Sequence, residues 1–578
     1  MRRLALLLAS ACLAPAAQAA TILPLDRATI LAGSPFDLKV EFDKVVTPEA
    51  AVTINGRPAA EVLGKEAVFI EKEPGVEASA IRIDAGAITA PGVYTVEAKA
   101  GDETRTVSWE VYGTPETPAA KNVIFMVADG LSMADRTAAR LMSKGMTEGK
   151  ANGRLNLDDL QYAAMIGTSS TNSMATDSAN TASAYMSGHK TAINALGVYA
   201  DRTEDSQDDP RVELISEALA RTGGKAIGIV TTAELQDATP AATVAHTRKR
   251  ADKAAIAAMI FERQPDVLLG GGSAYFLPQS TPGSKRKDDE NLVQQFQDAG
   301  YALATDAAGL EAAAGSNSGR ILGLFHTGNM DVALDRMFLK KGSVDTFPDQ
   351  PGLVRMTEVA LGQLAKDPEG FFAVIEAASV DKQKHTLDWE RAMIDMIEFD
   401  QAVGVARKFV AEHPDTLLVV TGDHTHGNAL IGSIDPARGA GRESVGVYAD
   451  AGFLGYEDAN DDGYPDALDV APRIAMFSNN FPDHYETWGP KLDGPFEPAV
   501  QNGNKDYVAN EAYRDVPGAV LREGNLPKSA DTGVHAVDDI LLQASGAGAE
   551  RFHGYMEQSD VYRVIAEILA LAPSKPSN

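Results

Sequence analysis

The sequence predicts an α/β fold with a central, mostly parallel sheet flanked by helices, preceded by a small all-β sandwich domain. After residue 121, short and wholly apolar runs alternate with helix-like stretches such as 252–263 and 391–412. Strands that are apolar on both faces are typical of a parallel sheet covered on both sides. The apolar runs lie at 123–127, 226–230, 267–269, 321–325, 372–375 and 417–420.

Residues 1–20 have the features of a secretory signal peptide. Arg2 and Arg3 form a basic start, an apolar stretch follows at 4–13, and the small residues Ala17 and Ala19 fit a cleavage site. The apolar stretch is shorter than the roughly 20 residues that a membrane-spanning helix needs, and no other stretch of the sequence reaches that length. We therefore expect a periplasmic or secreted protein without a membrane span.

Cys12 is the only cysteine and lies inside this signal. Lipidation at Cys12 is the alternative, although Ala9 stands where a lipidation motif prefers leucine. Removal of the signal would leave a mature chain without cysteine. Any metal would then be held by histidine, carboxylate and hydroxyl groups.

Residues 21–114 predict an Ig-like antiparallel β-sandwich, because apolar and polar residues alternate there with a period of two between glycines and prolines. A proline-containing linker at 115–120 follows, and the α/β domain takes residues 121–578. The sandwich sequence contains no constellation of chemically active residues. Its simplest role is that of a spacer or packing module.

The formal net charge is −29 and the sequence pI is about 4.7. Such an acidic surface repels nucleic-acid backbones and anionic membranes, which argues against a non-specific nucleic-acid binder. It also repels phosphate groups at long range. An anion site in this chain must therefore be locally positive, and bound metal ions can supply that charge.

Acidic and histidine side chains follow four of the apolar runs. Ligands of parallel sheets bind at the carboxyl ends of the strands, so these residues are candidates for one shared site. Carboxylates that converge repel one another unless cations lie between them. Mixed histidine and aspartate ligands suit zinc, and carboxylate and threonine oxygens suit magnesium. The residues are Asp129, Asp237, Glu376, Asp381, His385, Asp423, His424 and His426.

Ser178 follows Asp177 and opens a run of small residues at 179–184. A serine in this position is most often a helix N-cap. The alternative is a nucleophile, because free N–H groups at a helix start can receive an anion and a nearby metal lowers the pKa of the hydroxyl.

Several segments together resemble the alkaline phosphatase family in their order and style. They are NVIFMVADG, TDSANTASAYMSG, TAELQDATPAATVAH, DVLLGGG, EAASVDKQKH and GDHTHG. The resemblance covers roughly residues 121–430 and a short stretch near His535. It implies an alkaline phosphatase-like fold and metal-dependent hydrolysis of phosphate monoesters through a phosphoserine intermediate.

The resemblance implies two zinc ions and one magnesium ion, with Ser178 as the nucleophile. The first zinc would be held by Asp381, His385 and His535. The second would be held by Asp129, Asp423 and His424. Magnesium would be held by Asp129, Thr239 and Glu376. Three further residues would support these ligands: Asp237 by ordering water near magnesium, Lys382 by contacting phosphate through water, and His426 near the zincs.

The phosphate-binding arginine of the family stands four residues after a histidine that corresponds to His246. This position is Arg250, and Arg248 is a nearby competitor; the following ADKAAIA favours Arg250. A planar guanidinium makes bidentate contacts to phosphate that lysine cannot replace. His535 departs from the family pattern because Ala536 follows it, so a surface-loop histidine is the alternative there.

Residues 432–529 are an insertion that a compact family member would not need. Its segment 458–469 resembles an EF-hand or dockerin-like calcium loop, with Gly463 at the sixth position. The segment ends in aspartate rather than glutamate, which weakens bidentate binding, and a solvated acidic loop is the alternative. The candidate calcium ligands are Asp458, Asn460, Asp462, Tyr464, Asp466 and Asp469.

A phosphodiesterase of the same superfamily is the main alternative function. A sulfatase is disfavoured because DSANTASA lacks the proline and arginine of the sulfatase motif. A non-catalytic phosphate- or metal-binding protein is the alternative from another class. The expected partners are small phosphate monoesters. The physiological substrate stays open, and so does the choice between a monomer and a homodimer.

Overall fold

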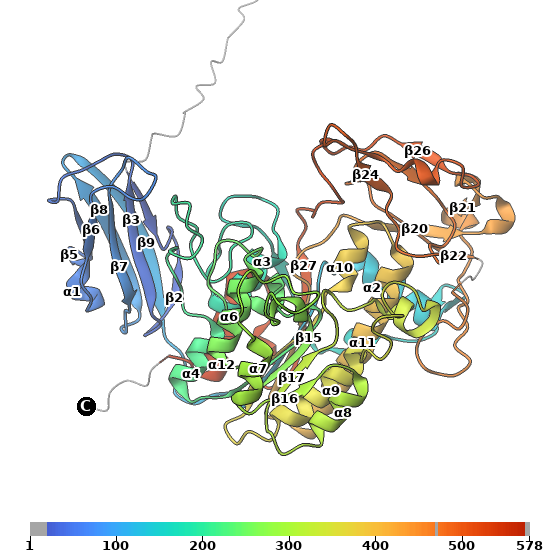
Figure 1. Cartoon of the computed structure of the whole chain (residues 1–578), viewed down its shortest axis with the longest axis horizontal. Helices are drawn as coiled ribbons and strands as arrows, with labels where there is room; N and C mark the ends of the chain where they lie inside the picture. Colours follow the sequence, from blue (N-terminus) through green and yellow to red (C-terminus); the bar gives the residue numbers. More distant parts are fainter. Residues whose placement is uncertain (1–19, 469–471, 573–578) are drawn as a thin grey trace, which may run out of the picture. The chain divides into compact units, whose positions relative to one another are not determined.

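The computed structural model describes residues 20–468 and 472–572 (Figure 1). The chain divides into two compact units. The first takes the chain up to Gly113 together with Asp201–Val212, and the second takes Thr114–Ala200 and the chain from Glu213 onward. The predicted signal peptide lies outside the described residues except for Ala20, the first residue of a strand.

The first unit is built of two sheets, as the alternating pattern predicts. Their strand orders are β1-β3-β7-β6 and β2-β9-β8-β4-β5. The rings of Phe36 on β3 and Trp109 on β9 meet edge to face at 5.5 Å, so the two sheets share a core. The elements are β1 (Ala20–Leu23), β2 (Thr29–Leu31), β3 (Phe36–Phe42), β4 (Ala51–Ile54), β5 (Arg57–Pro58), α1 (Ala59–Leu63), β6 (Val68–Ile70), β7 (Ala80–Gly86), β8 (Gly92–Ala100) and β9 (Glu103–Tyr112).

Lys39 is buried on β3 among carboxylates. Its Nζ lies 2.5 Å from Asp201 Oδ2 and 2.6 Å from Glu73 Oε1. Burial lowers the pKa of Lys39, but its carboxylate partners more than offset this and raise the pKa. The neighbouring Arg202 pairs with Glu73 at 2.6 Å and donates to the carbonyl of Ser79 at 2.9 Å. These contacts bind the distant segment Asp201–Val212 into the first unit, which the sequence pattern did not predict.

The second unit contains a ten-stranded sheet in the order β16-β17-β15-β14-β18-β10-β19-β27-β13-β28. Neighbouring strands from β16 to β19 are parallel, and β27 runs antiparallel to both of its neighbours. The predicted mostly parallel sheet is confirmed, and all six apolar runs form strands in it. The strands are β10 (Asn122–Ala128), β13 (Tyr162–Gly167), β14 (Ala226–Glu234), β15 (Val267–Gly271), β16 (Ala302–Ala304), β17 (Ile321–Leu324), β18 (Phe371–Ala377), β19 (Thr416–Thr421), β27 (Ile540–Gly546) and β28 (Gly554–Glu557).

Helices flank this sheet. The predicted helices at 252–263 and 391–412 correspond to α6 and α11, and α11 packs against β10, β18 and β19. Apolar side chains of α9 and α11 are buried with those of the central strands in one large core. The helices are α2 (Met133–Lys144), α3 (Ser178–Ser187), α4 (Ile215–Thr222), α5 (Ala238–Ala241), α6 (Lys253–Arg263), α7 (Leu292–Asp298), α8 (Ala307–Ala314), α9 (Leu353–Leu364), α10 (Ser379–Lys384), α11 (Trp389–Glu412) and α12 (Gln558–Leu569).

The region of the predicted insertion folds into short antiparallel ladders, drawn orange to red in Figure 1. The strand orders are β21-β20-β22, β23-β26 and β24-β25. Within residues 20–468 and 472–572, no helix combines the length and apolar character that crossing a membrane requires. The strands are β20 (Ala429–Ile434), β21 (Val445–Gly446), β22 (Arg473–Phe477), β23 (His484–Glu486), β24 (Ala499–Gln501), β25 (Tyr507–Ala509) and β26 (Val520–Arg522), and a further ribbon pairs β11 (Met146–Thr147) with β12 (Lys150–Ala151).

Replacing Lys39 with methionine should destabilise the first unit. The change leaves buried carboxylates without the ammonium that pairs with them, and breaking a buried ion pair costs about 3–5 kcal/mol. Urea denaturation measures the free energy of unfolding. The matched control is Lys44→Met, because Lys44 and Glu103 form an exposed pair with side chains 62% and 47% accessible. Such a pair contributes about 1 kcal/mol or less, so equal losses in the two variants would contradict the account.

Candidate metal centre

The order of the strands brings four chemically active loops together. β14, β18, β10 and β19 are consecutive neighbours in the sheet and all run parallel. Their carboxyl ends therefore lie along one edge. Asp129 directly follows β10, Asp423 lies two residues after β19, and Asp381 stands on α10, just after β18.

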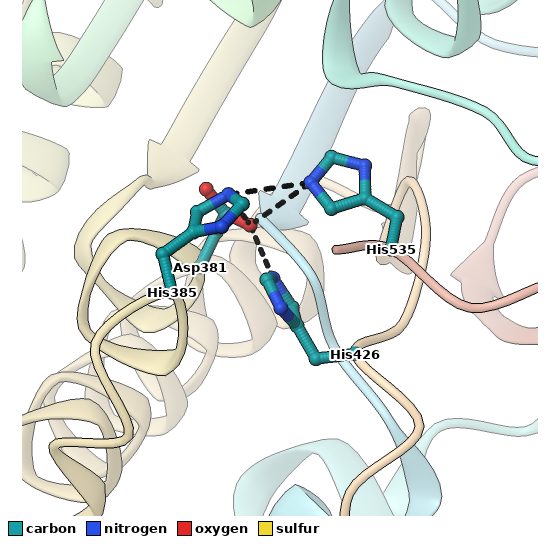
Figure 2. Close-up of side chains that lie close together, drawn as sticks. All are labelled: Asp381, His385, His426 and His535. Atoms are coloured by element: carbon teal, nitrogen blue, oxygen red, sulfur yellow. Dashed lines mark hydrogen bonds and ion pairs between the residues drawn. The ribbon is translucent and has the colours of Figure 1, made fainter. Parts of the chain in front are cut away.

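Two groups of ligand-type side chains form at this edge. The four-residue group consists of Asp381, His385, His426 and His535 (Figure 2). The three-residue group consists of Asp129, Asp381 and His424. In each group one candidate donor atom per residue lies within 4.8 Å of the others, and Asp381 belongs to both groups.

Asp381 Oδ1 is the centre of the four-residue group. It lies 2.5 Å from His426 Nε2, 3.4 Å from His385 Nε2 and 3.6 Å from His535 Nε2. His535 comes from a loop far along the chain, and its Nε2 lies 3.3 Å from His385 Nε2. The structure therefore brings His535 to the other predicted ligands, although Ala536 departs from the family pattern.

The protonation of two imidazoles shows that the four-residue group suits a cation. His385 Nδ1 lies 2.6 Å from the carbonyl oxygen of Gly533, and His535 Nδ1 lies 2.8 Å from that of Thr176. A carbonyl only accepts, so each Nδ1 carries a hydrogen, and in the neutral imidazole each Nε2 presents a lone pair. Two lone pairs facing each other repel, and a cation between them removes the repulsion. A ligating histidine usually donates its other N–H to a carbonyl in this way.

In the three-residue group, His424 lies close to several carboxylates. Its Nε2 lies 3.2 Å from Asp129 Oδ1, 3.3 Å from Asp423 Oδ2 and 3.8 Å from Asp381 Oδ1. Asp423 Oδ1 accepts the N–H of Gly130 at 2.8 Å, which fixes that carboxylate. The other oxygen, Asp423 Oδ2, is buried and has no hydrogen-bond partner among the described residues. This free oxygen is a suitable metal ligand.

The electrostatics of the cluster show a deficit of positive charge. Burial, together with the charges of Asp381, Asp423 and Glu376, raises the pKa of Asp129 well above its usual value. Burial also raises the pKa of Glu376 to about 7. Burial opposes ionisation of Asp381 too, but His385 and His426 hold its pKa well below the usual range. Bound divalent cations would keep all these carboxylates ionised.

The predicted magnesium ligands lie beside β14 and β18. Glu376 Oε2 accepts a hydrogen bond from Thr231 at 2.5 Å. Thr239 is buried on α5 and lies near enough to Glu376 to lower the pKa of that carboxyl slightly. The Thr239 hydroxyl nevertheless makes no hydrogen bond of regular geometry within the described part of the chain, so it is available to a cation.

Ser178 is the first residue of α3 but not its cap. The N-cap is Asp177, whose Oδ1 accepts the N–H of Asn180 at 3.1 Å. The Ser178 hydroxyl is therefore free to face the three-residue group. Its Oγ lies 3.3 Å from His424 Nε2, and 3.4 and 3.5 Å from the two carboxylate oxygens of Asp129.

Arg250 is held by two carboxylates, one of them that of Asp177, the residue before Ser178. Its guanidinium contacts Asp237 Oδ1 at 2.8 Å and Asp177 Oδ2 at 3.4 Å. The carboxylates raise the pKa of Arg250 despite its burial. Lys382 Nζ contacts the other oxygen of Asp237 at 2.6 Å. Asp237 thus holds two positive groups, and Arg250 also contacts the residue that precedes Ser178; a guanidinium placed in this way suits a phosphoryl group at the serine.

A family model described as alkaline phosphatase matches residues 120–571. The chain belongs to the alkaline phosphatase family. The alkaline phosphatase of Gadus morhua is 29% identical over 485 residues, which cover 77% of this chain and 91% of that protein. The alkaline phosphatase of Escherichia coli K12 is 33% identical over 384 residues, covering 60% of this chain and 77% of that protein.

Solved alkaline phosphatases share the fold. The enzyme of Thermus thermophilus superposes with a TM-score of 0.57 at 24% identity, over 80% of this chain and 94% of that chain. The enzyme of the Antarctic bacterium TAB5 has a TM-score of 0.53 at 21% identity, over 78% of this chain and 98% of that chain. A variant of the TAB5 enzyme, solved with magnesium in its M3 site, has a TM-score of 0.51 at 22% identity and the same two coverages.

Two residues of this alkaline phosphatase site escaped the sequence reasoning. Asp177 contacts Arg250. The sequence shows that Asp177 precedes Ser178, but it does not show that Asp177 lies close to Arg250 in the fold. Lys384 is buried, pairs with Asp135 at 2.8 Å and bonds to the carbonyl of Gly130, and so supports the loop that carries Asp129. The sequence feature that could have indicated this role is the position of Lys384 between Asp381 and His385.

The predicted calcium loop folds around its own carboxylates. Asp458 accepts the N–H groups of Asp462 at 3.0 Å and Gly463 at 2.9 Å. Asp466 accepts the N–H of Ala459, and Asn460 Nδ2 donates to Asp462 at 2.9 Å. The Tyr464 ring is buried against Phe338, so only its carbonyl could reach an ion. Asp469 lies outside the described residues.

Removing divalent metal with EDTA should lower the melting temperature, and more so at pH 8 than at pH 5.5. In the metal-free protein the pKa of Glu376 is about 7, raised from 4.5. A raised carboxyl pKa stabilises the fold fully below pH 4.5, and this stabilisation is lost as pH rises through 7.

Differential scanning calorimetry of metal-free and metal-loaded protein at both pH values checks this expectation. Readdition of zinc and magnesium should restore the melting temperature and serves as the control. An identical pH dependence in the two forms would contradict the account of the buried carboxylates.

Proposed function

We propose that this chain hydrolyses phosphate monoesters at the carboxyl ends of β14, β18, β10 and β19, with Ser178 as the nucleophile. The position of the Ser178 hydroxyl carries the proposal. Its Oγ lies 3.3 Å from His424 Nε2 and within 3.5 Å of both Asp129 oxygens, with Arg250 held nearby by Asp177 and Asp237. Family membership supports the same reaction.

Two zinc ions and one magnesium ion suit the donor sets. Imidazole with carboxylate suits zinc, and an all-oxygen set suits magnesium. When bound, these ions supply positive charge and lower the pKa of a nearby hydroxyl or water. The proposed ligands are Asp381, His385 and His535 for one zinc, Asp129, Asp423 and His424 for the other, and Asp129, Thr239 and Glu376 for magnesium.

The side chains around Ser178 have different roles in the proposed reaction. The Arg250 guanidinium has five N–H donors, so contacts to Asp177 and Asp237 leave others for phosphoryl oxygens. Burial opposes a charge on Lys382, but Asp237, Asp129 and Asp381 raise its pKa, so it stays protonated and adds positive charge. His426 holds Asp381 through a 2.5 Å contact.

The chemistry then proceeds in two displacements. The Ser178 oxygen attacks phosphorus, the ester oxygen leaves as an alcohol, and a phosphoserine forms. Water then attacks the same phosphorus, which releases inorganic phosphate and restores the serine. Fixed cationic groups stabilise the negative charge that builds on the phosphoryl oxygens in both steps.

A phosphodiesterase is not favoured. A monoester presents three terminal oxygens to the positive groups, whereas a diester presents two. Rates on p-nitrophenyl phosphate and bis-p-nitrophenyl phosphate separate the two activities. A faster rate on the diester would contradict the proposed reaction.

Location and assembly also belong to the proposal. The basic start, the apolar stretch and the small-residue cleavage motif in residues 1–20 support a periplasmic or secreted enzyme. Sequencing of the mature N-terminus tests the cleavage. The resemblance to a family with many dimers suggests a homodimer, and light scattering of the purified protein tests it.

Replacing Ser178 with alanine should reduce turnover of p-nitrophenyl phosphate by about 1000-fold or more, because no other group takes its place as nucleophile. Metal content, measured by elemental analysis, should stay unchanged since the other ligands remain. Ser173→Ala is the matched control, because Ser173 is an exposed serine shortly before the same helix. Activity that survives in Ser178→Ala would rule out the proposed nucleophile.

We also propose calcium at the loop 458–469, supported by the alternation of its oxygen side chains. Asp462→Asn should weaken calcium binding about tenfold or more, measured by isothermal titration calorimetry, because it removes a ligand charge. Asp461→Asn is the control, because Asp461 is outside the proposed ligand set and adopts φ 58°, which asparagine tolerates. Equal binding in the wild type and Asp462→Asn would support a solvated acidic loop instead.

A further inference from the structure

The insertion carries a cavity beside the four-residue group. Its volume is about 380 Å³, within the range that holds small organic ligands. Nothing in the sequence motifs indicates this cavity, and none of its lining residues has a role in the displacement steps described above. Residues that line it include Gly427, Phe477, Phe481, His484, Glu486 and Arg522.

The cavity shares its wall with the supports of the four-residue group. Gly427 directly follows His426, and Ser478, another lining residue, donates to the carbonyl of His426 at 3.3 Å. Phe481 packs closely against Gly533, since a Cβ added at Gly533 would lie 3.2 Å from the Phe481 ring. The carbonyl of Gly533 in turn accepts from His385. The cavity therefore lies directly against the residues that position His385 and His426.

The ionisable side chains of the cavity wall lie on a short antiparallel ladder, formed by β23 and β26. His484 and Glu486 are alternate residues of β23 and so point to the same face, and Arg522 on β26 lies opposite His484. The side chain of Glu486 is 15% exposed, and its Oε2 lies 3.7 Å from His484 Nε2 and 4.0 Å from Arg522 Nε.

His484 presents an unused acceptor. The side chain is 95% buried, at 5% exposure, and its Nδ1 donates to the carbonyl of Pro482 at 2.9 Å. In the neutral imidazole its Nε2 then carries a lone pair, and this nitrogen has no hydrogen-bond partner within the described residues. The Glu486 carboxylate lies 3.7 Å from this nitrogen, and its nearest charged donor, Arg522 Nε, lies 4.0 Å from the carboxylate. A buried acceptor without a partner is costly, so a ligand with donor groups would bind favourably here.

The lining selects the type of ligand. Glu486 and Glu523 outnumber Arg522, so the cavity disfavours a second anionic group. Phe477 and Phe481 offer apolar surface to a carbon skeleton, and the two acceptors need hydroxyl hydrogens. A hydroxyl-rich alcohol of the sugar type satisfies all three conditions.

The position of the cavity indicates which part of the substrate this alcohol would be. Ser178 lies beside the three-residue group, and displacement at phosphorus proceeds in line. The departing alcohol therefore points away from Ser178. The rings of His424 and His535 stack at 3.4 Å, so the four-residue group adjoins the three-residue group, and the cavity lining adjoins the four-residue group at His426. We propose that the cavity is the subsite for the alcohol part of the substrate, and that it favours sugar-type phosphate monoesters. This inference rests on the proposed function.

Glu486→Gln tests the subsite with two substrates. Glucose 6-phosphate carries the hydroxyls that would reach Glu486, whereas methyl phosphate is too small to reach it. We expect kcat/KM to fall about tenfold on glucose 6-phosphate and to change less than about twofold on methyl phosphate, because a hydrogen bond to a charged acceptor is lost only on the larger substrate. His484→Phe should act in the same direction.

Glu497→Gln is the matched control, because Glu497 is an exposed carboxylate of the same insertion outside the cavity lining. It should change neither rate. Equal factors on both substrates in Glu486→Gln, or no change on either, would overturn the subsite. Turnover of methyl phosphate by the wild type reports the proposed function separately, so failure of the subsite and failure of the reaction are distinguishable. Calorimetric binding of glucose 6-phosphate to Ser178→Ala, with and without Glu486→Gln, repeats the comparison without turnover.

Discussion

Repulsion among buried carboxylates is the constraint on which the rest of the site depends. Asp129, Glu376, Asp381 and Asp423 are each at most 5% exposed and lie at one edge of the sheet. Histidines partly offset the charge of Asp381. Asp129 and Glu376 keep raised pKa values because burial and neighbouring carboxylates outweigh the positive charge of Lys382. Cations would stabilise such a cluster, and in the proposed mechanism they would also lower the pKa of the nearby Ser178 hydroxyl.

The pattern of apolar residues in the sequence predicted much of the fold of the second unit. Short, wholly apolar runs that alternate with helix-like stretches are typical of strands with both faces covered, so they predicted the parallel strands β10, β14, β15, β17, β18 and β19 correctly. The same reasoning placed the ligands at strand ends. What the pattern could not give is strand order. The adjacency of β14, β18, β10 and β19 brings the loops together, and it depends on packing between segments far apart in the chain.

The unpredicted features share one physical cause, which is that they are pairings over long sequence distances. Asp177 meets Arg250 through the fold, and no local spacing encodes their contact. Asp201 joins Lys39 across 162 residues. The acceptors His484 and Glu486 form a cavity wall only because β23 pairs with β26, and short irregular ladders of this kind leave a weak sequence signal. Asp177, in contrast, is a local N-cap of α3, and it leaves the Ser178 hydroxyl free for the role proposed for it.

The central claim is that divalent cations balance this carboxylate cluster. Diffraction data collected on either side of the zinc absorption edge, from crystals of active protein, test it most directly. The account predicts two anomalous peaks, one among Asp381, His385 and His535 and one among Asp129, Asp423 and His424. Active crystals without a zinc signal at these two positions would contradict it.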